Sequence, residues 1–149
     1  MELNDDLEAV LDRKGHTVWF VGPEAPLQEA IGWMAEKNIG ALLVIEAGVL
    51  LGVVSERDVM RRAILQARSP LTTRVREIMS SDVVVVGVRC TIQDAMALMT
   101  HHRVRHLPVV DGETITGVIS IGDLVEWTIA EQKRMLDQLE QYVMGRYPS

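Results

Sequence analysis

The hydrophobic positions of the chain follow a helical period in two separate stretches, 26–37 and 91–102. In each stretch apolar residues recur at i, i+3, i+4 and i+7, which predicts an amphipathic helix. They are Leu27, Ala30, Ile31 and Met34 in the first stretch, and Ile92, Ala95, Met96 and Met99 in the second. Pro26 suits a first helical turn, and Thr91 with Asp94 predicts a capping box.

Short apolar runs flank both predicted helices and favour strands. A β-branched run precedes each helix, TVWFV at 17–21 and DVVVVGV at 82–88. Two further runs follow each helix and are joined by turns that contain Gly or Asp; they are 41–46 with 49–55, and 107–111 with 114–120. A second helix is predicted from about Asp58 and again from about Asp123. The predicted order is therefore β-α-β-β-α, and it occurs twice.

The two halves also align with each other residue by residue. Residues 16–60 match 81–125 without a gap, which indicates a tandem duplication. The identical pairs include Val18/Val83, Gly22/Gly87, Gln28/Gln93, Ala30/Ala95, Met34/Met99, Leu42/Leu107, Val44/Val109, Gly52/Gly117, Val53/Val118, Ser55/Ser120 and Asp58/Asp123.

The duplication predicts an α+β (α/β-like) fold of two β-α-β-β-α repeats. One repeat has only three short strands and would be marginal alone. We therefore expect the two copies to pack about a pseudo-two-fold axis, which would create two related clefts. The segment 67–75 carries a Ser-Pro turn signal and is the predicted linker. The predicted domains are 8–68 and 75–132, followed by a C-terminal helix and tail at 133–149.

Composition narrows the possible functions. The 149 residues carry a net charge of −6, which argues against a nucleic-acid partner. No apolar run approaches the ~18–20 residues needed to span a membrane. The lone Cys90 excludes an internal disulfide and fits a reducing compartment. We therefore expect a cytoplasmic protein with no membrane partner. Six arginines nevertheless fall between 57 and 76, either on a solvated helix and linker or at a local anion site.

The densest polar cluster is HHRVRH at 101–106. A metal site lacks a Cys, Asp or Glu nearby to complete four ligands, so no metal is predicted. Nucleic-acid binding lacks interleaved aromatic residues. His101, His102 and Arg103 fit a solvated helix end, whereas Arg105 and His106 fall at the start of a strand, where anion binding is favoured.

The pattern Gly-Val-hydrophobic-Ser-x-x-Asp ends the third strand of both copies, as GVVSERD (52–58) and GVISIGD (117–123). One interpretation of Ser-x-x-Asp at such a junction is a capping box with no further role. It can also bind a ligand, because the glycine admits close approach, the helix start attracts an anion and the aspartate can accept hydrogen bonds from a ribose diol. No catalytic set is present, because neither Ser55 nor Ser120 belongs to a known nucleophile motif.

The duplicated unit resembles a pair of cystathionine β-synthase (CBS) domains. The stretches TIQDAMALM, RVRHLPVVD and GVISIGDLV carry the resemblance, which covers about residues 8 to 130. Short stand-alone pairs of this kind are similar to bacterial energy-sensing and signal-transduction proteins. The resemblance implies a non-enzymatic module with AMP, ADP, ATP or, in some members, NAD or S-adenosylmethionine as regulatory ligand in the clefts between the repeats.

The resemblance also implies two nucleotide sites that combine residues of both copies. The first would contain Ser55, Arg57, Asp58, Asp82, Val84, Arg105 and His106. The second would contain Ser120, Gly122, Asp123, Lys14, Thr17, Val18, Trp19, Gly40 and Ala41. The two aspartates would hold ribose hydroxyls, the two serines would bond ribose or phosphate oxygens, and main-chain groups near Thr17–Trp19 and Asp82–Val84 would read the adenine edge.

The two implied sites differ in charge. Arg105 and His106 resemble paired basic phosphate contacts of the γ subunit of AMP-activated kinase, whereas copy one has Gly40 and Ala41 there. The first site is therefore expected to favour the more anionic nucleotide. The second has Lys14 as its phosphate partner, and Trp19 would narrow its adenine pocket.

Partners other than nucleotide are expected as well. The apolar residues of the C-terminal helical stretch either pack on the core or form a homodimer contact, and the resemblance favours the dimer. A separate protein would be the downstream target. The alternative function is an interaction module whose clefts hold no nucleotide.

Overall fold

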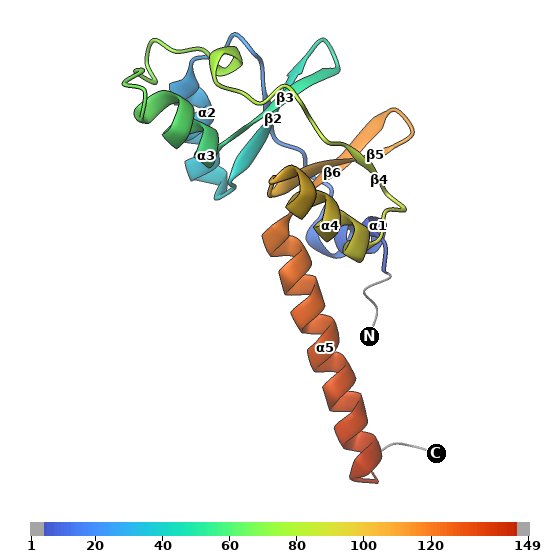
Figure 1. Cartoon of the computed structure of the whole chain (residues 1–149). Helices are drawn as coiled ribbons and strands as arrows, with labels where there is room; N and C mark the ends of the chain where they lie inside the picture. The colour runs from blue at the N-terminus through green and yellow to red at the C-terminus, as the bar shows by residue number, and fades with distance from the viewer. Residues whose placement is uncertain (1–4, 146–149) are drawn as a thin grey trace. The chain divides into compact units, whose positions relative to one another are not determined.

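The computed structural model describes residues 5–145, so the last four residues of the predicted tail, 146–149, lie outside the described residues. The chain forms two units, each with one three-stranded sheet (Figure 1). The central unit comprises Val18–Val84, and the terminal unit comprises, of the described residues, 5–17 together with 85–145. Among the described residues, no helix combines the length and apolar character needed to cross a membrane.

The central unit contains copy one. Its sheet has the order β1-β2-β3, with β1 parallel to β2 and β2 antiparallel to β3. In chain order its elements are β1 (Phe20–Val21), α2 (Leu27–Lys37), β2 (Ala41–Glu46), β3 (Val49–Ser55), α3 (Glu56–Asp58), the π-helix η1 (Val59–Ile64) and the 3-10 helix η2 (Val75–Glu77).

The terminal unit contains copy two and repeats this topology in the order β4-β5-β6. In chain order its elements are α1 (Leu7–Lys14), β4 (Val86–Gly87), α4 (Ile92–His102), β5 (His106–Asp111), β6 (Thr114–Ser120) and α5 (Ile121–Val143). The α+β class and the two β-α-β-β-α repeats are thus confirmed.

The cores of the two units are built from equivalent positions of the duplication. On α2 and α4 most of the apolar stripe is buried. Three consecutive residues of β2 and of β5 are buried, whereas burial alternates towards the ends of β3 and β6. The buried pairs are Leu27/Ile92, Ala30/Ala95, Met34/Met99, Leu42/Leu107, Val44/Val109 and Val54/Ile119. The helical period of the sequence therefore identified the inward faces of α2 and α4.

Two local predictions were wrong, the length of the first strand in each copy and the capping box at Thr91. The runs 17–21 and 82–88 form strands of only two residues, because only Phe20–Val21 and Val86–Gly87 pair with a neighbouring strand. The second helix of copy one, predicted from about Asp58, is present; it begins at Glu56 and continues as a π-helix from Val59. At α4, the Thr91 hydroxyl accepts a hydrogen bond from the Asp94 N–H, but the reciprocal bond that would complete a capping box is not formed.

Each unit also contains the segment that precedes the other copy. Helix α1 lies before copy one, yet Leu7 and Leu11 are buried in the terminal unit and the Leu7 N–H donates to the Cys90 carbonyl at 2.9 Å. Conversely, Val75 is buried in the central unit, and Ser80 exchanges two backbone hydrogen bonds with Val53 there. The predicted domain limits follow the sequence repeat, whereas these packing units exchange the two lead-in segments.

The exchanged segments cover the two equivalent glycines of the Gly-Val-hydrophobic-Ser-x-x-Asp pattern. A Cβ on Gly52 would lie 2.6 Å from the Ser80 carbonyl oxygen, and one on Gly117 would lie 2.5 Å from a Leu11 methyl carbon. The expectation that these glycines admit a ligand was therefore wrong, because this chain's own residues occupy the space.

This packing predicts unequal costs for adding a methyl group at the two glycines. Gly52→Ala should lower the free energy of unfolding by about 2–3 kcal/mol, because a backbone carbonyl cannot rotate away. Gly117→Ala should cost about 1 kcal/mol, because the Leu11 side chain can change rotamer. Chemical denaturation of the two variants measures the difference. Equal costs would contradict this account of the packing.

Candidate functional site

In the central unit, Ser55 and Asp58 bond reciprocally at the start of α3. The Ser55 Oγ accepts from the Asp58 N–H at 3.1 Å, and the Asp58 Oδ2 accepts from the Ser55 N–H at 3.0 Å. The Ser55 hydroxyl also lies 3.0 Å from this Oδ2. The capping-box interpretation of the motif is thus confirmed here.

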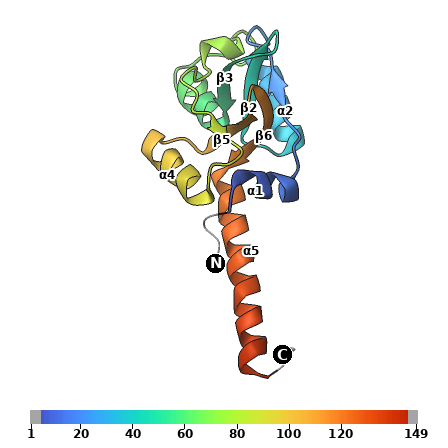
Figure 2. The same cartoon turned by 90° about the vertical axis from the view of Figure 1, so that its right-hand side faces the viewer.

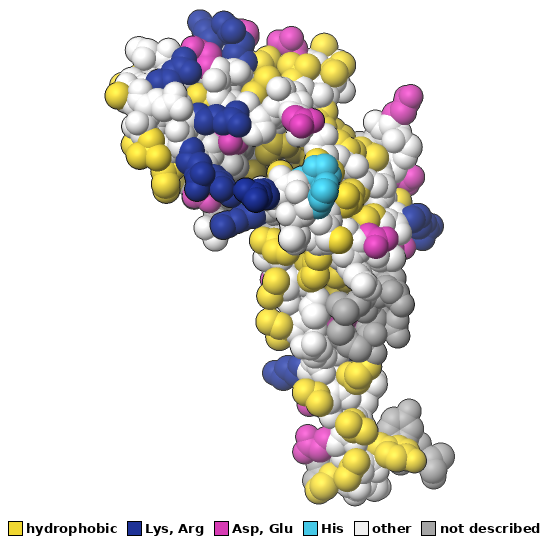
Figure 3. Space-filling view, viewed as in Figure 1, with side chains coloured by type: hydrophobic (Ala, Val, Ile, Leu, Met, Phe, Trp, Pro, Cys, Tyr) yellow, Lys and Arg dark blue, Asp and Glu magenta, His cyan; other side chains and the backbone are white. Residues whose placement is uncertain are grey.

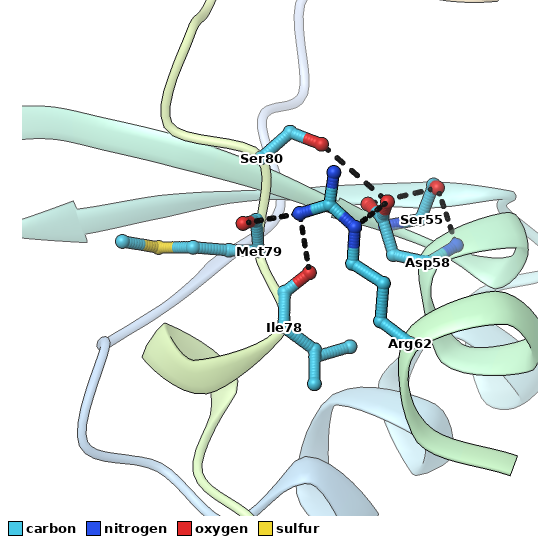
Figure 4. A network of polar contacts seen from close by, with 6 residues as sticks. All are labelled: Ser55, Asp58, Arg62, Ile78, Met79 and Ser80. Atoms are coloured by element: carbon cyan, nitrogen blue, oxygen red, sulfur yellow. Dashed lines mark hydrogen bonds and ion pairs between the residues drawn. The ribbon is translucent and has the colours of Figure 1, made fainter. Parts of the chain in front are cut away.

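The other carboxylate oxygen of Asp58 has longer contacts (Figure 4). Its Oδ1 lies 3.4 Å from the Ser80 hydroxyl and 3.8 Å from the Arg62 Nε. Arg62 also donates to the carbonyls of Met79 at 3.1 Å and Ile78 at 3.4 Å, so its guanidinium lies between the aspartate and the lead-in segment. The Asp58 side chain is only 14% exposed, which makes it a largely buried anion with one loosely held oxygen.

The terminal unit forms the equivalent box at the start of α5. The Ser120 Oγ accepts from the Asp123 N–H at 3.1 Å, and the Asp123 Oδ2 accepts from the Ser120 N–H at 2.8 Å. The Lys14 ammonium adds an ion pair to this Oδ2 and donates to the Val118 carbonyl at 2.7 Å. Lys14, which was predicted for this site, therefore contacts Asp123 directly.

His106 and Arg105 lie beside the motif of their own copy. His106 pairs with Ser120 across the β5–β6 ladder, and the Arg105 carbonyl accepts from the Ile121 N–H at 2.8 Å. Burial lowers the pKa of His106 below its ordinary value, and the positive charges of Lys14 and Arg105 lower it further against the opposing effect of Asp123. The ring is therefore neutral near pH 7, and the predicted basic pair supplies one charge instead of two.

Gly40 and Ala41 hold the equivalent places in copy one. The Gly40 carbonyl accepts from the Glu56 N–H at 3.0 Å, and Ala41 pairs with Ser55. Each motif thus contacts the second-strand start of its own copy. The implied combinations of Arg105 and His106 with Ser55, and of Gly40 and Ala41 with Ser120, join residues of different units and stay predictions.

The remaining candidate residues fall into two groups. Arg57, Asp82, Gly122 and Thr17 are exposed, whereas Val18 and Val84 are half-buried. Trp19 stacks on Trp33 with ring centroids 5.9 Å apart, and the Lys37 ammonium lies 4.5 Å from the Trp19 ring centroid. Trp19 also packs against the buried core of the central unit, so its observed role is packing.

Sequence reasoning missed two partners, Arg62 and Ser80, that the fold brings to Asp58. Arg62 had a usable signal, because it lies four residues after Asp58 and hence on the same helical face. Ser80 had none, since it reaches Asp58 only through packing.

The arginine-rich stretch is mostly neutralised. Figure 3 shows Lys and Arg side chains gathered on the central unit. Four of the six arginines between 57 and 76 form ion pairs; they are Arg62 with Asp58, Arg68 with Glu77, and Arg74 and Arg76 with Glu24. A solvated, ion-paired surface therefore accounts for most of this cluster.

The first part of HHRVRH ends a helix, as predicted. His101 and His102 are exposed in the last turn of α4, and Arg103 follows with a left-handed φ of 57°. Within residues 5–145, no group of three His, Cys, Asp or Glu side chains is arranged to hold a metal ion. Burial raises the pKa of the Cys90 thiol, which disfavours the reactive thiolate.

His16 should make stability depend on pH. Its Nε2 lies 3.0 Å from Asp12 Oδ1 and its Nδ1 2.9 Å from the Thr116 carbonyl, and these contacts raise its pKa above the ordinary 6.5. A raised folded-state pKa contributes stability below the unfolded pKa that is lost as pH rises through the folded value. His16→Asn should therefore lower the Tm at about pH 5.5 and have little effect at about pH 8.5. Thermal unfolding at both pH values tests this, and an equal loss at both would contradict it.

Known proteins match the chain over most of its length. A family model for the CBS domain matches twice, at residues 14–64 and 75–129. The mitochondrial CBS domain-containing protein CBSX3 of Arabidopsis thaliana is 36% identical over 138 residues, covering 89% of this chain but 66% of that protein, just under two thirds of its length. The CBS domain-containing protein YhcV of Bacillus subtilis is 36% identical over 118 residues, covering 79% of this chain and 84% of that protein. Among solved structures, a candidate signal-transduction protein with CBS domains from Burkholderia ambifaria is 45% identical with a TM-score of 0.83, covering 86% of this chain and 96% of that one.

Proposed function

Because the chain belongs to the CBS domain family and carries two such domains, we propose that it is a non-enzymatic regulatory module that binds adenine nucleotides. The observation that carries the proposal is the pair of equivalent Ser-x-x-Asp motifs. Each presents a carboxylate that is largely buried, with side-chain exposures of 14% for Asp58 and 21% for Asp123, beside a cation. Buried carboxylates of this kind can accept both hydroxyls of a ribose diol.

The contacts of each aspartate suggest how a nucleotide would enter. At Asp58, the Oδ1 contacts of 3.4 and 3.8 Å are long enough for a ribose hydroxyl to replace them. At Asp123, the Lys14 ammonium would leave the carboxylate and contact a phosphate instead. AMP, ADP, ATP and NAD all carry the required ribose and phosphate groups.

A bound nucleotide would be signalled by a change in the conformation of the protein. A nucleotide can shift the protein between two conformations only if it binds one of them more tightly. Lys14 is the last residue of α1, and the chain from there leads through Gly15 and His16 into the central unit. Withdrawal of Lys14 by a phosphate would therefore alter the segment that links the two units, and a downstream protein would read this change.

A second candidate function rests on a specific observation. Both Ser-x-x-Asp motifs form complete capping boxes, so both aspartates already have a structural role. A module that only associates with itself or another protein would need nothing more from them.

We propose that the chain also associates with itself, whether or not it binds nucleotide. Met60 and Ile64 are 61% and 56% exposed, and their equivalents in copy two, Val125 and Ile129, are 45% and 59% exposed. Repeated apolar positions on the second helices suit a homodimer contact. Among related structures, a CBS-CP12 protein of bloom-forming cyanobacteria, 27% identical to this chain, is hexameric.

Thermal unfolding with a nucleotide panel tests the proposal. A ligand that binds only the folded state stabilises it by about 2.7 kcal/mol at 100 times its Kd. We expect AMP, ADP, ATP or NAD to raise the Tm, and GMP and GTP, which lack adenine, to leave it unchanged. No shift with any adenine nucleotide would favour the module without nucleotide.

A further inference from the structure

The last part of α5 extends beyond the packed part of the terminal unit. The first part of α5 packs on the terminal unit through Leu124, Trp127 and Glu131, and Glu131 bonds Arg13 of α1 at 3.0 Å. From residue 132 to 145 every residue is exposed, and α5 runs past α1 and α4 in both views (Figures 1 and 2). A helical stretch of this length is marginal by itself in water, so its stability calls for a packing partner.

The exposed side of α5 carries a continuous heptad stripe. Its residues are spaced alternately by four and three positions, the spacing of the a and d positions of a coiled coil. They are Val125, Ile129, Gln132, Leu136, Leu139 and Val143. The five apolar members are 45%, 59%, 64%, 57% and 74% exposed, and Figure 3 shows hydrophobic side chains along the length of the helix.

This stripe lies opposite the face that packs on the unit. In the same heptad, Leu124 and Glu131 occupy c positions and Trp127 an f position, which are the outer positions of a coiled coil. The helix therefore has two distinct faces. One packs on the terminal unit, and the other is exposed and can pack against a second helix.

We propose that this stripe packs against the same stripe of a second copy of the chain as a parallel coiled coil. In parallel register each apolar residue meets its own counterpart, and Gln132 meets Gln132 of the partner subunit. A single polar residue in such a seam specifies register and the number of strands. The proposal holds whether or not the chain binds nucleotide.

The charges beside the stripe favour the parallel orientation. Glu126, Lys133 and Glu140 occupy the e positions along one edge. A fully overlapping antiparallel pair would place Glu126 beside Glu140 of the partner subunit, and Lys133 beside the partner's Lys133. Both are like-charge contacts, which are destabilising. In the parallel pair these positions lie beside uncharged g positions, Thr128 and Met135.

Sedimentation of the full chain tests whether two copies associate through the heptad stripe of α5. Leu136→Asp combined with Leu139→Asp should weaken self-association at least tenfold, because each change places a charge in the apolar seam. The matched control is Gln138→Asp with Gln141→Asp, which adds the same charge on the opposite face and should leave self-association unchanged. Equal effects of the two double variants, or none from the first, would overturn the proposal.

A cross-link tests the orientation independently. In a Cys90→Ser background, Leu139→Cys should form a disulfide-linked dimer on mild oxidation, since the d positions of a parallel pair face each other. Gln141→Cys should not. Failure of the Leu139→Cys variant to cross-link, or equal cross-linking of both, would overturn the parallel pair.

Discussion

Replacing Asp58 or Asp123 with asparagine should lower the affinity of that motif for AMP about 100-fold while leaving the fold intact. Asparagine keeps an oxygen that can accept the serine N–H bond of the capping box. It loses the negative charge that strengthens hydrogen bonds from a ribose diol, and such charge-assisted bonds contribute about 1.5–3 kcal/mol each. Isothermal titration of each single variant should show one site lost and the other retained.

The matched control is Asp94→Asn. Asp94 lies three residues after the N-cap of α4, as the motif aspartates do in their helices, but it belongs to no Ser-x-x-Asp motif. It should leave AMP affinity unchanged. If all three variants bound AMP as the unchanged protein does, the aspartates would be helix caps only.

Lys14→Met should separate phosphate recognition from ribose recognition in the terminal unit. The Lys14 ammonium pairs with Asp123 and would move to a phosphate when nucleotide binds. Its removal should weaken AMP and ATP about tenfold, since one charged hydrogen bond is lost. Adenosine has no phosphate and should bind as well or better, because the Asp123 carboxylate is released.

Arg13→Met provides the control for Lys14→Met. Arg13 is the neighbouring residue of α1, but its partner is Glu131 and its guanidinium lies 3.8 Å from the Trp127 ring centroid. It should not alter the ratio of AMP to adenosine affinity. Parallel losses of AMP and adenosine binding in Lys14→Met would assign Lys14 a purely structural role.

Local patterns in the sequence predicted most of the fold. The helices α2 and α4 follow from their hydrophobic period, because their burial repeats with the period of a helix. The strands β2, β3, β5 and β6 follow from short apolar runs between turns, since β2 and β5 are each buried at three consecutive residues. The length of the first strand of each copy was overestimated, because residues 17–19 and 82–85 do not pair with a neighbouring strand. Propensity describes a residue's own conformation and does not decide whether a neighbouring strand reaches it.

The candidate site was less predictable, because packing over long sequence distances completes it. Ser55, Asp58, Ser120 and Asp123 carry a local signature and could be found from it. Their partners Ser80 and Lys14 come from lead-in segments that pack with the other copy, 22 and 109 residues away in sequence. The resemblance implied Lys14, whereas nothing local marked Ser80 or the exchange of the two segments.

The neutral state of His106 also depends on tertiary structure. Sequence shows only a basic pair, Arg105 and His106, whereas the fold buries the ring near Lys14 and lowers its pKa. The expected preference of one site for a more anionic nucleotide therefore depends on fewer charges than the sequence indicated. Of the predicted basic pair, Arg105 alone then supplies a positive charge.

The central claim is that this CBS pair binds adenine nucleotide through its two Ser-x-x-Asp motifs, and calorimetric titration of the full chain with AMP tests it most directly. The account predicts saturable binding that is reduced in Asp58→Asn and in Asp123→Asn and abolished in the double variant. Absence of binding by the unchanged chain, or full binding by the double variant, would contradict it.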